Sequence, residues 1–244
     1  MTESEMNAMV YFSANDVRFE RIPVPEINDF EVLIKVKYCG LCQSDVKKIV
    51  SNARKPPRVF GHEFSGVIEK VGKSVSGWKK GDKVIAYHHI PCFKCYYCLD
   101  ERYSQCETYR KVGTTAGFEA DGGGFAEFVK LEKHVVENGL FKIPENVDFK
   151  LATMVEPVNC CLAGIIKLDL KFGDKVAILG QGQIGLILGK LASASGAEVT
   201  GFDLISERLL KSKEFGVEHT LNAGDKELKE KVNALTNGIG FDKV

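Results

Sequence analysis

The alternation of apolar and polar residues predicts that the first part of the chain consists mainly of β-strands. Between residues 31 and 39, the order Val32, Ile34, Val36, Tyr38 alternates with Lys35 and Lys37, which is the two-residue period of a strand with one buried and one solvated face. Similar short strands are predicted at residues 59–72, 82–87 and 125–130, separated by glycines. The pattern predicts an antiparallel or mixed β domain over residues 1–154.

A different pattern appears after Pro144 and predicts a second domain over residues 155–244. The run Val176-Ala-Ile-Leu179 is apolar throughout, as expected for a strand that is buried on both faces of a parallel sheet. A helical stretch from residue 184 to 194 and a second strand over residues 198–202 follow. The chain is therefore predicted to combine a β-rich domain with an α/β domain.

The turn after the first of these strands carries a glycine pattern typical of dinucleotide binding. In Gly180-Gln-Gly182-Gln-Ile-Gly185, the glycines permit a tight turn, close approach of a pyrophosphate, and close packing of helix on strand. Asp203 ends the next strand, where a carboxylate accepts a hydrogen bond from the adenosine ribose and repels a 2′-phosphate. The complete order of elements predicts NAD rather than NADP. The alternative is that these glycines serve only as turns.

The length of the second domain predicts that it is incomplete. A full dinucleotide-binding fold has two βαβαβ halves, and the residues after Gly173 suffice for about three strand and helix units. Residues 240–244 are predicted to begin a fourth strand. We therefore expect that the half that holds nicotinamide is missing and that the sequence is truncated.

Four of the eight cysteines, Cys92, Cys95, Cys98 and Cys106, lie in one short run. Gaps of two residues let a tight loop turn successive sulfur atoms toward one point, and four thiolates suit a tetrahedral Zn²⁺ site. Because four protein ligands leave no open position, this zinc is predicted to be structural, in a lobe of about residues 91–107. Disulfides or buried free thiols are the alternative, but nothing else suggests an oxidising compartment.

A second group of residues offers the mixed ligand types of a zinc ion with an open position. The group consists of Cys42, His62, Glu63 and Glu156. Adjacent strand residues point to opposite faces, so either Gly61 allows a turn or Glu63 lies behind the direct ligands. Glu156 precedes a proline at a predicted helix start, where positive partial charge favours its ionised form. Cys160, one turn further, is a weaker candidate that is equally well explained as core.

Composition excludes several classes of protein. The 33 basic and 33 acidic side chains balance, which argues against a nucleic-acid-binding protein. The N-terminus is acidic where a secretory signal is basic, and no apolar run reaches about 18 residues. We expect a cytoplasmic protein without nucleic-acid or membrane partners.

Together these motifs resemble the zinc-dependent medium-chain alcohol dehydrogenases throughout the chain. The resemblance is carried by Cys42-Gln-Ser44-Asp45, Gly61-His62-Glu63-x2-Gly66-x5-Gly72, the four lobe cysteines, Glu156-Pro157 and Gly180-x-Gly182-x2-Gly185. Glu63 together with Glu156-Pro157 looks most like the polyol (sorbitol-type) and threonine dehydrogenase branch. The resemblance implies a GroES-like β-rich catalytic domain followed by a partial Rossmann domain. It also implies a homo-oligomer, a dimer or tetramer, for the full-length parent.

The resemblance further implies roles for single residues. Cys42, His62 and Glu156 would bind the catalytic zinc, with Glu63 either a direct ligand or exchanging with water. Asp45 would orient His62, and Ser44 would pass the substrate proton outward. Lys47 stands where the next member of this relay is often histidine.

The cofactor contacts implied by the resemblance lie in the second domain. They are Gly180, Gly182, Gln183, Ile184, Gly185, Asp203 and Arg208. His88, His89, His134 and His219 match no metal position and are interpreted as structural or surface residues.

The predicted reaction is hydride transfer from a secondary alcohol, a polyol or related hydroxy compound, to NAD⁺, with one catalytic and one structural zinc. A zinc-free quinone reductase of the same fold is one alternative, but it has no need of Cys42, His62 or the lobe. A zinc-ribbon interaction or nucleic-acid module is another, which predicts a basic surface and no cofactor motif. Two further alternatives remain. The chain could be a truncated fragment that binds zinc without turnover, or the full-length parent could have threonine dehydrogenase-type activity.

Overall fold

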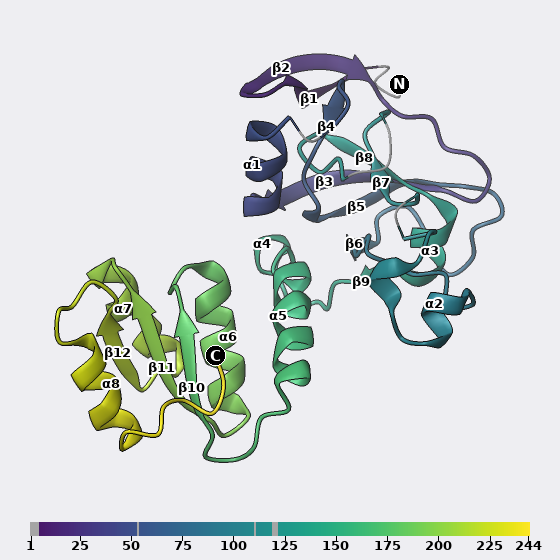
Figure 1. Ribbon diagram of the computed structural model, residues 1–244. Coiled ribbons are helices and arrows are strands. Elements are labelled where there is room, and N and C mark those ends of the chain that lie inside the picture. The colour runs from purple at the N-terminus through teal and green to yellow at the C-terminus, as the bar shows by residue number, and fades with distance from the viewer. Residues whose placement is uncertain (1–4, 53, 110, 119–121) are drawn as a thin grey trace. The chain divides into compact units, whose positions relative to one another are not determined.

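The computed structural model describes residues 5–52, 54–109, 111–118 and 122–244 (Figure 1). The chain divides into two compact units, Met1–Glu156 and Pro157–Val244. We propose that these units correspond to the domains expected at residues 1–154 and 155–244. The described part of the chain contains no helix with the length and apolar character needed to cross a membrane.

The first unit consists mainly of antiparallel strands. Those described are β1 (Glu5–Ser13), β2 (Asp16–Pro23), β3 (Val32–Gly40), β4 (Arg58–Val59), β5 (Glu63–Val71), β6 (Lys83–Ala86), β7 (Thr114–Thr115), β8 (Phe128–Leu131) and β9 (Leu140–Lys142). They form two sheets, with the orders β2-β1-β4 and β7-β8-β3-β5-β6-β9. Short helices connect them: α1 (Gln43–Val50), α2 (Tyr96–Leu99), η1 (Tyr103–Gln105), α3 (Lys133–Asn138) and α4 (Phe149–Ala152).

Strand β3 contributes to two apolar clusters. Val32 and Ile34 pack with residues of β5, β6 and β8 in one cluster. Leu33, on the opposite face, packs with residues of β1 and β2 in the other. The first half of β3 is therefore buried on both faces, whereas the two-residue alternation predicts one solvated face. The solvated positions begin only at Lys35.

The second unit has the βαβ order predicted from the sequence. Its elements are α5 (Val155–Leu168), which begins at the end of the first unit, then β10 (Lys175–Leu179), α6 (Gln183–Ala194), β11 (Glu198–Asp203), α7 (Ser206–Ser212), η2 (Lys213–Phe215), β12 (His219–Asn222) and α8 (Leu228–Thr236). The strands are parallel, in the order β10-β11-β12. Val176 and Ile178 pack against Ala192 of α6 and Ile165 of α5. The predicted combination of a β-rich and an α/β part is confirmed.

The end of the chain returns to the first parallel strand. Lys243 forms an isolated parallel bridge with Val176, and the Ala177 N–H donates to the Lys243 carbonyl at 2.9 Å. Because β11 occupies the other side of β10, the chain crosses to the opposite edge of the sheet after β12. Such a crossing is the topological switch point of dinucleotide-binding sheets.

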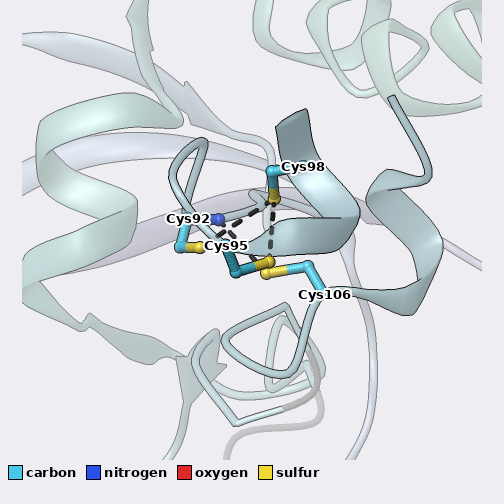
Figure 2. Close-up of side chains that lie close together, drawn as sticks. All are labelled: Cys92, Cys95, Cys98 and Cys106. Atoms are coloured by element: carbon cyan, nitrogen blue, oxygen red, sulfur yellow. Dashed lines mark hydrogen bonds between the residues drawn. The ribbon is translucent and has the colours of Figure 1, made fainter. Parts of the chain in front are cut away.

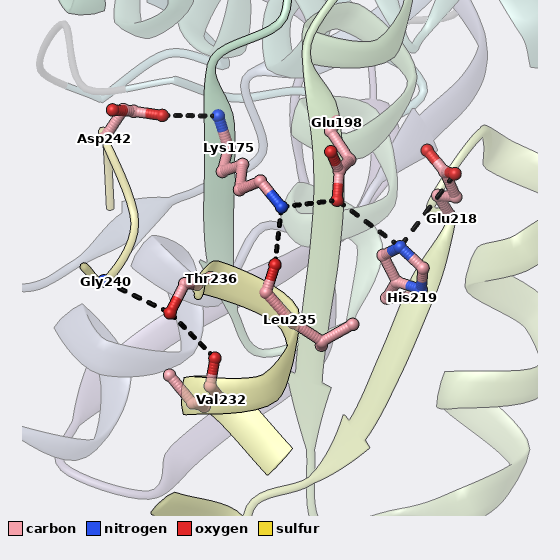
Figure 3. A network of polar contacts seen from close by, with 9 residues as sticks. All are labelled: Lys175, Glu198, Glu218, His219, Val232, Leu235, Thr236, Gly240 and Asp242. Carbon is pink, nitrogen blue, oxygen red and sulfur yellow. Dashed lines mark hydrogen bonds and ion pairs between the residues drawn. The ribbon is translucent and has the colours of Figure 1, made fainter. Parts of the chain in front are cut away.

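A polar network joins the starts of the parallel strands (Figure 3). The Lys175 N–H donates to Asp242 at 2.8 Å, and the Lys175 ammonium lies 3.3 Å from Glu198 and donates to the Leu235 carbonyl. His219, the first residue of β12, lies 3.5 Å from the same glutamate. This network stands at the amino ends of the strands, at the opposite edge from the glycine loop.

The predicted strands agree with the structure in part. Residues 82–87 contain β6, β3 begins and ends one residue later than the strand predicted at 31–39, and the strand predicted at 125–130 begins only at Phe128. The segment 59–72 is divided into β4 and β5 by a break at residues 60–62. The sequence pattern does not predict the hairpin of β1 and β2.

We expect Leu131→Ala to lower the free energy of unfolding of the first unit by about 2–5 kcal/mol, because this side chain is fully buried in the apolar cluster that contains Val32 and Ile34. Urea unfolding followed by the fluorescence of Trp78, the single tryptophan, measures the change; this residue packs on the same cluster. Leu151→Ala is the matched control, since Leu151 is 59% exposed and its loss costs at most about 0.5 kcal/mol. Equal effects of the two substitutions would contradict this core.

Candidate active site and metal sites

The four lobe cysteines converge on one point (Figure 2). All four lie in the segment between β6 and β7. Cys92 lies in the loop before α2, Cys95 directly precedes α2, Cys98 lies in α2, and Cys106 directly follows η1. Cys98 Sγ lies 3.9 Å from Cys92 Sγ and 3.5 Å from Cys95 Sγ. All eight cysteines of the chain are free thiols, so the disulfide alternative does not hold.

The spacing of these sulfur atoms suits a tetrahedral zinc ion. Zn–S bonds of about 2.3 Å at tetrahedral angles place sulfur atoms about 3.8 Å apart. The two separations from Cys98 lie on either side of this value. The sulfur positions of the lobe therefore suit a structural zinc ion with four thiolate ligands.

The surroundings shift the pKa values of three of these thiols in different directions. The backbone N–H groups of Tyr109 and Cys92 outweigh burial and lower the pKa of Cys106 to about 6. The N–H of Lys94 lowers the pKa of Cys92. Burial, in contrast, raises the pKa of Cys98 to about 12. A cation at the centre would stabilise the thiolate form of Cys98, which burial disfavours.

Cys42, His62 and Glu63 form a second donor group in which one ligand atom of each lies within 4.8 Å of the others. Cys42 is the residue that precedes α1, and its Sγ accepts the Ser44 N–H at 3.5 Å. Glu63 opens β5 and pairs with Gly40, at the end of β3. The ends of two paired strands therefore bring the three side chains together.

A turn at Gly61 explains how adjacent residues reach one site. Its φ is +98°, a conformation that favours glycine, and it lies in the break between β4 and β5. Of the two alternatives left by the sequence, the chain therefore takes the turn. His62 and Glu63 both belong to the donor group.

Asp45 supports His62 from α1. Its side chain is fully buried, and its Oδ1 lies 3.2 Å from His62 Nδ1 and 3.9 Å from Lys48 Nζ. With Nδ1 facing this carboxylate, the other ring nitrogen of His62 is left for a metal ion. The expected pairing of Asp45 with His62 is thus present in the geometry.

The pKa values of the donors reflect their burial. Burial raises the pKa of the Cys42 thiol, although the hydrogen bonds from Ser44 act to lower it. Burial also raises the pKa of Glu63, with the charge of Glu156 adding to it. For His62 burial acts in the opposite direction, but the hydrogen bond and charge of Asp45 outweigh it and raise the pKa. The raised pKa values favour the protonated forms of these donors, and a divalent cation competes with those protons on binding.

Glu156 lies beside this group and contacts a histidine. It is buried, it lines one small cavity together with His62 and Glu63, and its Oε1 lies 3.7 Å from His89 Nε2. Among the described residues, the compact donor group contains Glu63 and not Glu156. Cys160 is exposed and belongs to neither donor group of the described chain.

Two histidines, His88 and His89, lie at this site, although the sequence predicts structural or surface positions for them. The His88 ring centroid is 5.2 Å from that of His62 and 3.8 Å from that of His89, which stacks on Tyr109 at 5.1 Å. Burial and repulsion from His62 and Lys48 lower the pKa of His89 to about 4. Their spacing from the other donors carries no metal signature, so the sequence alone does not reveal their position.

The residues expected to relay a proton lie on the outer side of α1. Ser44 and Lys47 are exposed, whereas Asp45 between them is buried. Lys48, which lies one helical turn after Asp45, contacts the Asp45 carboxylate.

Thiol, imidazole and carboxylate donors with one side open are the ligand set of a catalytic zinc.

The glycine loop of the second unit has the features of a dinucleotide cradle. Gly180 has a φ of +91°, and a Cβ on Gly185 would lie 1.8 Å from the Gly180 carbonyl oxygen. Gly182 differs, because a Cβ there would have its nearest protein atom, Arg208 Nη1, at 4.0 Å. Packing within the protein therefore explains Gly185 but not Gly182, and the open space at Gly182 lies at the start of α6, where phosphates bind.

Asp203 lies directly beside this loop. Its two oxygens accept the N–H groups of Gln181 at 2.7 Å and Ile205 at 2.9 Å, and these bonds hold its pKa below the usual range. Arg208 Nη1 lies 3.8 Å from the same carboxylate. Gln183 and Ile184 open α6 immediately after the loop.

Gln181 is a residue of this loop that the sequence reasoning does not single out. It is 1% exposed, its side-chain amide donates to the Ile178 carbonyl at 2.9 Å, and a Cβ on Gly201 would lie 2.7 Å from it. The side chain therefore fills the space beneath the loop and supports it from the sheet.

Comparison with known proteins agrees with this geometry. Residues 28–145 match the family described as "Alcohol dehydrogenase GroES-like domain", and residues 184–244 match "Zinc-binding dehydrogenase". The sorbitol dehydrogenase of Bacillus subtilis (strain 168) is 31% identical over 97% of this chain and 67% of its own length. The L-threonine 3-dehydrogenase of Bacillus velezensis is 34% identical over 92% of this chain and 64% of its own length.

A solved structure gives the same picture. A protein of Sinorhizobium meliloti 1021, described as a zinc-binding dehydrogenase and bound to NADP, superposes with a TM-score of 0.81 and 30% identity, over 98% of this chain and 67% of that one. The chain thus spans about two thirds or less of the lengths of the proteins it matches.

We expect Cys95→Ser to remove one equivalent of metal from the purified chain and to lower its thermal midpoint, because a structural site of this kind needs all four thiolates. Elemental analysis and thermal unfolding measure the two effects. Cys160→Ser is the matched control, since this exposed thiol lies outside both donor groups of the described residues. Unchanged metal content in Cys95→Ser would contradict a metal site in the lobe.

Proposed function

Because this chain belongs to the zinc-dependent medium-chain alcohol dehydrogenases, we propose that it carries the sites of an oxidoreductase that transfers a hydride from a secondary alcohol to NAD⁺. The observation that carries the proposal is the convergence of Cys42, His62 and Glu63 at one point with Asp45 behind His62. A purely structural zinc protein needs the lobe but not this second, open donor group.

Two zinc ions are proposed, one in each donor group. The lobe cysteines would hold the structural ion, and Cys42, His62, Glu63 and Glu156 would hold the catalytic one. Glu63 already stands in the donor group, while Glu156 shares its cavity and contacts His89. This arrangement favours Glu63 as a direct ligand in the resting site and Glu156 as the carboxylate that can replace it.

The bound groups would supply the chemistry in one step each: zinc lowers the pKa of an alcohol as a Lewis acid, and NAD⁺ accepts the hydride. The chain's own residues do the rest. Asp45 fixes the orientation of His62 through Nδ1. Ser44, exposed next to Cys42, would accept the proton of the alcohol and pass it to solvent or to Lys47, one turn along α1.

NAD is the proposed cofactor, held by Gly180, Gly182, Gln183, Ile184, Gly185, Asp203 and Arg208. The related Sinorhizobium structure holds NADP. In this chain an ionised carboxylate stands beside the loop, which favours a ribose hydroxyl and repels a 2′-phosphate.

The proposed substrate is a small polyol or related hydroxy compound, since the relatives that match include a sorbitol dehydrogenase and an L-threonine 3-dehydrogenase. Threonine is the second candidate on the same ground. The eight free thiols support a reducing, cytoplasmic location, and a homo-oligomer is proposed for the whole protein.

The proposal is tested first by zinc content. The purified chain should contain two equivalents of zinc, and Cys42→Ala should contain one, because only the open donor group loses a ligand. Cys160→Ser should keep both. In the full-length parent with two zinc ions bound, NAD⁺ should be reduced in the presence of a polyol or threonine, and Cys42→Ala should abolish this activity. One equivalent that Cys42→Ala leaves unchanged would contradict the catalytic site.

The cofactor site is tested by binding of ADP-ribose, which probes the adenosine half alone. Gly182→Ala should weaken binding at least about tenfold while leaving the thermal midpoint unchanged, because the new methyl group meets ligand but no protein atom within 3.9 Å of its position. Gly185→Ala should lower the thermal midpoint, because its methyl group overlaps the Gly180 carbonyl. Calorimetric titration measures the affinities, and equal affinity of Gly182→Ala and the unchanged chain would contradict a cofactor at this loop.

A further inference from the structure

Gly40, the last residue of β3, lies against the carboxylate of Glu63. The antiparallel register pairs the two residues directly. A Cβ built on Gly40 would lie 2.3 Å from Glu63 Oε2 and 3.4 Å from Glu63 Cδ. The carboxylate thus occupies the volume that any other side chain at position 40 would need.

The path of the backbone does not explain a glycine here. Gly40 is absent from the glycines with positive φ in the described chain, so other residues can adopt its conformation. Gly66 of the same sheet is different, because its Cβ would meet the carbonyl oxygen of Lys35 at 2.4 Å. The overlap at Gly40 is with the end of a side chain, and that side chain is a member of the donor group.

The surroundings direct how such an overlap would be relieved. The Cys39 thiol donates to the Gly40 carbonyl at 3.4 Å, and its Sγ lies 2.9 Å from a Cβ built on Gly61. The end of β3 is therefore packed against the turn that presents His62. Movement of the Glu63 carboxylate costs less than movement of this packed strand end.

We infer that Gly40 is a positioning residue for the metal site: the absence of a side chain at position 40 lets the Glu63 carboxylate stand beside Cys42 and His62. The inference rests on the proposed catalytic metal site. A methyl group at position 40 displaces the carboxylate from the donor group, while the apolar contacts of β3 nearer its start remain.

Cobalt binding to the 244-residue chain tests this inference without turnover, since the absorption of Co²⁺ depends on its ligands. We expect Gly40→Ala to weaken Co²⁺ binding at the Cys42 site about 10–100-fold and to change its visible spectrum, with metal in the lobe unchanged. In a Glu63→Ala background, Gly40→Ala should have little further effect, because that background removes Glu63 Oε2 and Cδ, two of the three atoms nearest the new methyl position, and leaves Cβ at 3.1 Å.

Gly66→Ala is the matched control for damage to the sheet. It should lower the thermal midpoint without changing the cobalt spectrum of the folded chain, because its overlap is with backbone away from Glu63. If Gly40→Ala also lowers the midpoint, Glu63→Ala has to restore it. Loss of stability that is not restored would overturn the inference.

Two further outcomes separate the inference from the proposed function. The inference fails, while the proposed function stands, if Gly40→Ala keeps the cobalt affinity and spectrum of the unchanged chain. It also fails if the effects of Gly40→Ala and Glu63→Ala on cobalt affinity are additive. If the unchanged chain takes up cobalt only in the lobe, the proposed catalytic site fails and the inference falls with it.

Discussion

The pairing of β3 with β5 is the constraint on which the chemistry of the first unit depends. The register that pairs Gly40 with Glu63 also sets where β3 delivers the chain to Cys42 and α1. The turn at Gly61 then decides that two neighbouring residues face one point. These backbone features bring the donors together without a bound ion, whereas burial raises the pKa of the Cys42 thiol and of the Glu63 carboxyl.

The two proposed metal sites are built by different means. The lobe is local: all four thiols come from one excursion, and α2 and η1 turn them inward. The second group is assembled from α1 and β5, with Glu156 contributed by the start of α5, so it depends on the whole first unit. A change in the core of the sheet is therefore expected to affect the open site more than the lobe.

The sequence is most informative where chemistry demands a fixed spacing. The cysteine run, the glycine loop with Asp203, and the pairing of Asp45 with His62 are all present in the geometry. The sequence is less informative where spacing is set by tertiary structure. His88 and His89 reach the site only because β6 ends beside β5, and the choice between one and two strands at residues 59–72 depended on the conformation of Gly61. The role of Gly40 cannot be read from its neighbours in sequence, because its constraint comes from a residue on the opposite strand.

The position of the lobe also has a consequence for the order of assembly during synthesis. Cys106 is the last of the lobe ligands, and Glu156 ends the first unit, so every proposed zinc ligand precedes the glycine loop in the chain. A ribosome adds about 5–20 residues per second, and domains generally fold as units from the amino end. The nascent first unit therefore has all of its proposed zinc ligands before the glycine loop is synthesised, so zinc can bind the emerging chain before a nucleotide-binding surface exists.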